Sequence, residues 1–149
     1  GKCQSVCATD INEKPLLGAR ANLERLGADG VKLVLCDGLA TITRDDADTV
    51  IIAGMGGEVI SGIIARADFL RDNTVSLILQ PTTAAKELRQ FLAQNGFLVE
   101  RETAIAENGK IYSVMAVRFS GKPYDISDIQ SLIGLLAPTD DDAIAYIKK

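Results

Sequence analysis

The 149 residues of this chain include 20 acidic and 16 basic ones, for a formal net charge of -4, and 47% of them are hydrophobic. This length and composition predict one globular domain, and the negative charge disfavours a protein that holds nucleic acid through bulk positive charge, although a local basic patch is compatible with it. The sequence contains no histidine, which excludes Ser-His-Asp triads, Cys-His pairs and HExxH zinc sites.

The three cysteines are predicted to be reduced thiols, because their number is odd and no signal peptide is recognisable. Cys3 and Cys7 have the spacing that begins a radical iron–sulfur motif, but Asp10 stands where the next ligand is needed. We therefore expect no metal. No apolar run reaches the ~20 residues of a membrane span. The default expectation is a cytoplasmic protein without a membrane partner.

The first third of the chain predicts three strands and one helix. The strands cover residues 5–9, 31–36 and 49–54. The helix starts after Asn12 as its N-cap and stops at Gly27. Its apolar positions follow helical spacing: Leu16, Ala19, Leu23 and Leu26. Polar residues 41–48 predict a loop or a short helix.

The remainder continues the alternation. Helices are predicted over 57–67 and 84–96, with a strand over 74–80 between them that ends at Pro81. The inward positions are Val59, Ile60, Ile63 and Ile64 in the first helix and Leu88, Phe91 and Leu92 in the second. Strands 97–107 and 110–119 form a hairpin at Asn108-Gly109. The basic residues Arg66, Arg71, Lys86, Arg89 and Arg101 are assigned to solvated surface.

Alternating strands and helices, with strands that are apolar throughout, predict an α/β fold with a mostly parallel sheet covered on both sides. A doubly wound sheet that finishes in an antiparallel pair resembles the Rossmann-like sheet of class I methyltransferases more than a plain dinucleotide-binding fold. We assign residues 1–119 to this domain. Residues 120–149 are assigned to a helical extension of two pieces around Pro138, the second capped by Thr139 or Asp140.

Ligands of open α/β sheets bind beyond the carboxyl ends of the strands, where four features lie. Asp10 accepts hydrogen bonds from a ribose or merely caps a turn. Asp37-Gly38 faces an adenine amino group or forms a common Asp-Gly turn. Gln80-Pro81 ends a third strand.

The fourth feature is the GMGG segment, residues 54–57 (Gly54, Met55, Gly56 and Gly57). Val59 replaces the third glycine of a dinucleotide fingerprint, and the segment lacks the lysine of a phosphate-binding loop. Its glycines allow close approach of a ligand, or they simply make a tight strand-to-helix turn. Lys110 and Tyr112 open the last strand, where Tyr112 is either a core ring or a stacking platform.

Taken in order, the segments ATDINEKPLLGARANLERLG, CDGL, IAGMGG, LILQP, LRQFLAQNGF and ENGKIYSVMAV resemble the bacterial tRNA adenine-22 N1-methyltransferase family. The resemblance covers residues 8–118. It implies a class I fold that uses S-adenosyl-L-methionine, a C-terminal helical extension, and methyl transfer to N1 of an adenine in tRNA. Attack by the N1 lone pair needs no strong general base, and the base must be unpaired or flipped out.

Carried over by position, the resemblance implies two groups of binding residues. Asp10, with the adjoining Ile11 and Asn12, holds the cofactor ribose, and Asp37 with Gly38 faces its adenine. Residues 54–57 line the meeting point of the methyl donor and the target base. Gln80 and Pro81 border the base pocket, and Lys110 and Tyr112 are further substrate-binding candidates.

The family's first strand and its acidic, glycine-containing cofactor loop have no counterpart in this sequence, and the helical extension is short. We therefore expect a methyltransferase fragment, truncated at its N-terminus, that binds S-adenosyl-L-methionine weakly or not at all. Micromolar binding in calorimetry would contradict this. Another RNA or a small nucleophile as substrate, or a non-catalytic nucleotide-binding or interaction module, remain alternatives, and a nicotinamide oxidoreductase is the least favoured. The sequence leaves the oligomeric state open.

Overall fold

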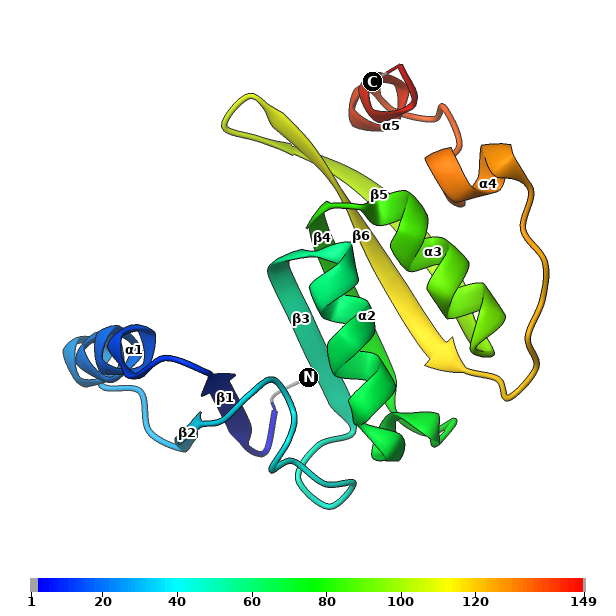
Figure 1. The fold of residues 1–149 in the computed structure, drawn as a ribbon. Helices are drawn as coiled ribbons and strands as arrows, with labels where there is room; N and C mark the ends of the chain where they lie inside the picture. The colour runs from blue at the N-terminus through cyan, green and yellow to red at the C-terminus, as the bar shows by residue number, and fades with distance from the viewer. Residues whose placement is uncertain (1–2, 149) are drawn as a thin grey trace. The chain divides into compact units, whose positions relative to one another are not determined.

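The computed structural model describes residues 3–148, which form two compact units that divide between Asp46 and Ala47 (Figure 1). The first unit contains β1 (Val6–Asp10), α1 (Glu13–Leu26) and β2 (Val31–Leu35). Strands β1 and β2 pair in parallel, from Val6 opposite Val31 to Asp10 opposite Leu35. Their carboxyl ends therefore lie at the same edge of this small sheet.

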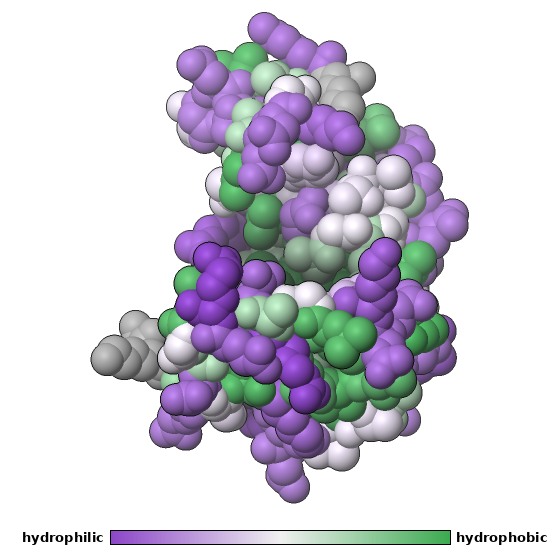
Figure 2. Space-filling model, turned by 90° about the vertical axis from the view of Figure 1, so that its left-hand side faces the viewer, coloured by the Kyte–Doolittle hydropathy of each residue, from purple (hydrophilic) through white to green (hydrophobic). Residues whose placement is uncertain are grey.

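Helix α1 follows the sequence signals closely. Asn12 has the extended backbone of an N-cap, and Gly27 ends the helix in the left-handed conformation at φ 59°. None of the described residues of the first unit is fully buried, and Leu26, at the end of the predicted stripe, is 67% exposed. The other residues of this stripe, Leu16, Ala19 and Leu23, are partly buried. Apolar patches among hydrophilic residues are visible on the face of the molecule drawn in Figure 2.

The second unit is built on a four-stranded sheet in the order β3-β4-β6-β5. Its strands are β3 (Thr49–Gly56), β4 (Ser76–Thr83), β5 (Phe97–Glu107) and β6 (Lys110–Phe119). Strand β3 pairs with β4 in parallel, and the two other pairings are antiparallel. Helices α2 (Gly57–Arg66) and α3 (Ala85–Gln94), with the 3-10 turn η1 (Asp68–Arg71), connect the strands, and α4 (Asp128–Ile133) and α5 (Asp141–Ile147) follow β6.

The core of the second unit lies between the sheet and helices α2 and α3, which cover the same face (Figure 1). Its most buried apolar side chains come from every one of these elements: Ile60, Leu77, Leu79, Leu88, Leu92 and Met115, each 0–1% exposed. Val59 was predicted to point inward but is 55% exposed. The inward face of α2 is set by Ile60, Ile63 and Ile64, and Val59 falls outside it.

The predicted hairpin is confirmed in detail. Asn108 and Gly109 both have positive φ, 50° and 73°, which is the backbone of the two-residue turn that Asn-Gly favours. The ladder begins at once with Glu107 opposite Lys110 and is regular to Arg101 opposite Ala116; Glu100 is then passed over, and pairing resumes from Val99 to Phe97. The turn sets the register of the hairpin from Glu107 back to Arg101, and the irregularity at Glu100 changes it beyond that point.

Pro81 does not end its strand, contrary to the sequence prediction, because β4 continues to Thr83. Strand β6 pairs with β4 only from Ser76 to Leu79, so the backbone nitrogen of Pro81 is not needed as a donor on that side. A proline is tolerated in a strand at such a position.

Both C-terminal helices begin at side-chain caps, and the sequence had indicated the one on α5. Ser127 and Gln130 form a reciprocal capping box on α4. Asp140, rather than Thr139, is the N-cap of α5 and accepts a hydrogen bond from the Ala143 amide at 2.8 Å. Within residues 3–148, no helix combines the length and apolar character needed to cross a bilayer.

Arg89 was assigned to solvated surface, and this was wrong: it is 3% exposed. Its guanidinium forms an ion pair with Glu102 at 2.6 Å and donates to the carbonyl oxygens of Ser131 and Leu132 and to the Tyr146 hydroxyl. Burial opposes the charge, but the hydrogen bonds and the charge of Glu102 outweigh it and raise the pKa of Arg89 above its ordinary value. This buried cluster joins α3 and β5 to both C-terminal helices.

Candidate functional site

The two carboxylates of the first unit lie at one sheet edge, as predicted. Asp10 is the last residue of β1, and its backbone oxygen accepts from the Cys36 amide, which comes directly before Asp37. The Thr9 hydroxyl donates to the Gly38 carbonyl at 2.8 Å and ties the two strand ends together. The structure therefore brings Asp10 and Asp37-Gly38 to the same edge.

The Asp10 carboxylate is already oriented by its own chain. Its Oδ1 accepts a hydrogen bond from the backbone amide of Asn12 at 2.8 Å, which closes a turn before α1. Ile11, between them, is 63% exposed. Asp10 therefore caps a turn, as one of the two alternatives predicted. The residue is partly buried at the end of β1.

In the second unit, the GMGG segment lies mostly within β3 rather than after it. Gly54 has φ 77°, and the space next to its α-carbon is open. The β3–β4 register shifts on either side of Met55, which pairs with Pro81. Met55 itself is 39% exposed. The segment thus presents a kinked backbone and one apolar side chain at the carboxyl end of β3.

Gly57, the first residue of α2, is required for close packing. A Cβ on Gly57 would overlap the carbonyl oxygen of Ala84 and would lie 3.1 Å from the Leu88 Cβ. Ala84 precedes α3 and has φ 53°, an uncommon conformation for a residue with a side chain. The starts of α2 and α3 therefore touch through backbone, which leaves no room for a side chain between them.

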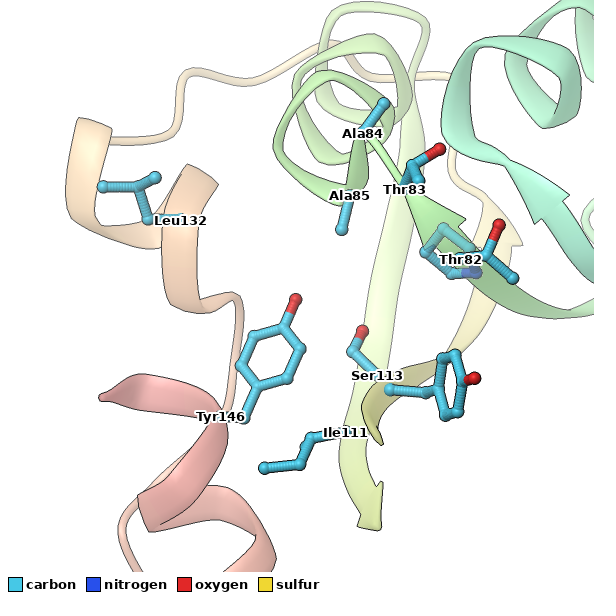
Figure 3. A pocket seen from close by; sticks show the side chains of 10 residues that line it. Thr82, Thr83, Ala84, Ala85, Ile111, Ser113, Leu132 and Tyr146 are labelled. Atoms are coloured by element: carbon cyan, nitrogen blue, oxygen red, sulfur yellow. The ribbon is translucent and has the colours of Figure 1, made fainter. Parts of the chain in front are cut away.

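Beside this contact lies a pocket with a volume of about 230 Å³, built only from the second unit. Its walls come from the end of β4, the start of α3, the start of β6 and the C-terminal helices: Pro81, Thr82, Thr83, Ala84, Ala85, Ile111, Tyr112, Ser113, Leu132 and Tyr146. Tyr146 of α5 and Ser113 of β6 lie on opposite sides of it (Figure 3). The lining contains no charged side chain, which suits a neutral ligand.

The pocket collects some of the predicted substrate-binding residues and not others. Pro81 and Tyr112 line it, whereas Lys110 is exposed at the hairpin and is absent from the lining. Gln80 is also absent from the lining, and its side chain instead accepts from the Gly54 amide at 2.9 Å.

Sequence reasoning missed Tyr146 and Ser113 as pocket residues. Both adjoin the Arg89 cluster, since Tyr146 accepts from Arg89 and Ser113 donates to Glu102. No spacing rule connects residue 146 with residue 113. Across the described part of the chain, no group of His, Cys, Asp and Glu side chains suits a metal ion.

Residues 1–115 match the family of methyltransferase domains, which is more than half of the chain. The chain belongs to this family. Its similarity to solved members also confirms the predicted Rossmann-like class I methyltransferase fold. One of them, from Streptococcus pneumoniae, is described as a putative tRNA (m1A22) methyltransferase and is 28% identical, with a TM-score of 0.83 over 95% of this chain and 65% of that one.

Two further comparisons point the same way. A Streptococcus pneumoniae structure with S-adenosyl-L-methionine bound is 29% identical, with a TM-score of 0.77 over 89% of this methyltransferase chain and 62% of that one. The tRNA (adenine(22)-N(1))-methyltransferase of Bacillus subtilis is 29% identical over 136 residues, 91% of this chain. The chain spans 57% of the length of that relative.

Proposed function

We propose that this chain is the methyl-transferring part of an S-adenosyl-L-methionine-dependent enzyme that methylates N1 of an adenine in tRNA, at the position called 22 in its relatives. The observation that carries the proposal is the open backbone at Gly54, near the carboxyl end of β3 and beside a neutral aromatic-walled pocket, in a chain of the methyltransferase family. The similarity to proteins described as tRNA (m1A22) methyltransferases supports the choice of substrate.

The residues of the first unit fit the nucleoside part of the cofactor. A ribose offers two hydroxyl donors, and the Asp10 carboxylate, held in place by the Asn12 amide, is a suitable acceptor at a strand end. Asp37 and Gly38 lie at the same edge and fit the adenine amino group. S-adenosyl-L-methionine supplies a methyl group on a positively charged sulfur, which makes that methyl electrophilic.

The residues of the second unit fit the target base. The pocket has apolar and aromatic walls for a flat base, with Tyr112 and Tyr146 as the aromatic rings and Pro81 as an apolar surface. The N1 lone pair forms the new N–C bond while the S–C bond breaks and its electrons return to sulfur. N1 of the adenine carries no proton to remove, so the reaction needs no general base. The pocket has to orient the adenine and exclude water.

The substrate is tested by methyl transfer from labelled S-adenosyl-L-methionine with the intact natural protein. We expect label in a tRNA that carries the target adenine and none in the same tRNA with that adenine changed to guanine. Label in both would favour another nucleotide or RNA, and label in neither would favour a binding module without catalysis.

Met55→Ala is expected to lower kcat of the intact protein by about ten- to a hundredfold, because Met55 is the GMGG side chain able to contact the base and loose positioning is costly. Met55 is 39% exposed, so the midpoint of thermal unfolding should change little. Val59→Ala is the matched control, since Val59 is also exposed but lies on α2, outside the GMGG segment. Full activity of Met55→Ala would disprove this role.

A further inference from the structure

The pairing of β3 with β4 is interrupted at one residue of the GMGG segment. The parallel register is regular from Thr49 opposite Ser76 to Ala53 opposite Gln80, and the next pair is Met55 opposite Pro81. Gly54 is thus passed over, and its φ of 77° turns its peptide out of the regular strand direction. Its neighbour across the gap, Pro81, has no backbone N–H with which to restore the ladder.

The Gln80 side chain takes the place of the missing backbone contact. Its Oε1 accepts from the Gly54 amide at 2.9 Å, and its Nε2 donates to the Pro81 carbonyl at 3.3 Å. Only one orientation of the side-chain amide satisfies both partners, because Gly54 presents a donor and Pro81 an acceptor. Both ends of the Gln80 amide are therefore used to hold the irregular part of the sheet.

We propose that Gln80 is a positioning residue for methyl transfer: it fixes the Ala53–Gly54 peptide, directly before Met55, and acts on the target base through Met55. The inference rests on the proposed function, since it assigns a cause to the placement of Met55 at the carboxyl end of β3. The family resemblance implied that Gln80 borders the base pocket. In the structure the Gln80 amide instead accepts from Gly54 of the GMGG segment. In this proposal the target base contacts the Met55 side chain of the same segment.

The hydrogen bond is tested first, by amide hydrogen exchange of Gly54 in this chain, followed by NMR. Gln80→Met keeps the length of the side chain but removes its amide, so the Gly54 amide should exchange about tenfold faster. Gln80→Glu keeps the acceptor for Gly54 but loses the donor to the Pro81 carbonyl, so the protection of Gly54 should fall less than in Gln80→Met. Gln94→Met is the control, because Gln94 is an exposed glutamine at the end of α3. If Gln80→Met does not fold, Gln80→Asn, whose amide is one methylene too short, replaces it.

The role in catalysis is tested by steady-state methylation of tRNA with the intact natural protein. Gln80→Met should lower kcat about tenfold, with KM for S-adenosyl-L-methionine and for tRNA within about twofold of wild type. Gln80→Glu should lower kcat less than Gln80→Met, because it keeps the acceptor for Gly54. Gln94→Met should leave both constants unchanged.

The possible outcomes separate the inference from the proposed function. Unchanged exchange of Gly54 in Gln80→Met overturns the inference, whatever the protein methylates. A raised KM for tRNA with an unchanged kcat also overturns it, since that pattern indicates direct contact with substrate. A wild-type protein that methylates no adenine disproves the proposed function, while the Gly54 exchange result stands independently.

Discussion

Replacing Arg89 with methionine is expected to lower the free energy of unfolding of the second unit by about 3–5 kcal/mol. The substitution keeps the aliphatic length of the side chain but leaves the carboxylate of Glu102 buried without its counter-charge. It also removes the donor to the Ser131 and Leu132 carbonyls, which holds α4 against α3. Denaturant unfolding followed by near-ultraviolet circular dichroism measures the loss, because Tyr112, Tyr124 and Tyr146 all lie in the second unit.

Arg118→Met provides the matched control. Arg118 also pairs with a glutamate, Glu100 at 3.3 Å, but the two side chains are 38% and 45% exposed. Solvent screens such a pair, so its loss should cost less than about 1 kcal/mol. The double variant Arg89→Met, Glu102→Leu should recover much of the stability lost in Arg89→Met, since it removes both buried charges. Equal losses in Arg89→Met and Arg118→Met would show that the buried cluster does not stabilise the unit.

Gly57→Ala is expected to lower the free energy of unfolding by about 2–3 kcal/mol, because the added methyl group overlaps the Ala84 carbonyl oxygen. The overlap can be relieved only if the start of α2 moves away from the start of α3. The same chemical change at Gly62, in the middle of α2, should raise the free energy of unfolding by about 0.5–1 kcal/mol through helix propensity. There the nearest atom to the new methyl group is the Arg66 Nη1 at 3.5 Å, an ordinary contact.

Urea titrations of the two alanine variants and the wild type measure both effects under one condition. Both variants add one methyl group to the same helix, so the decisive result is that the free energy of unfolding falls in Gly57→Ala and rises in Gly62→Ala. A Gly57→Ala protein as stable as the wild type would mean that the two helix starts are not in backbone contact. Packing would then not require a glycine at position 57, the last residue of the GMGG segment.

Local signals in the sequence account for the elements and for much of the candidate site. The Asn108-Gly109 turn, the end of α1 at Gly27 and the cap of α5 at Asp140 depend on residues a few positions apart, so they are readable from the chain. The same holds for the grouping of Asp10 with Asp37, because the ends of paired parallel strands meet at one edge. The family resemblance predicted the methyltransferase fold, which the comparisons confirm.

Other parts of the site depend on contacts that no local pattern records. Tyr146 became a pocket wall because α5 packs against the sheet through a small apolar cluster that includes Ala104, Leu136 and Ala143. Gln80 looked like a polar residue at a strand end, but the shifted register at Gly54 gives its amide a specific partner 26 positions away. A register shift of this kind arises from the packing of two strands and is not visible in either strand alone.

The sequence by itself thus determined the order of strands and helices, the turn of the hairpin and the family that the chain resembles, because those properties follow from short-range patterns along the chain. Only the tertiary structure decided that Arg89 is a buried ion-pair partner and not a solvated side chain. Its partners Glu102 and Tyr146 lie 13 and 57 positions further along the chain. Whether a charged side chain can be buried depends on such distant partners, because they compensate for its lost hydration. They come into contact with it only when the chain has folded.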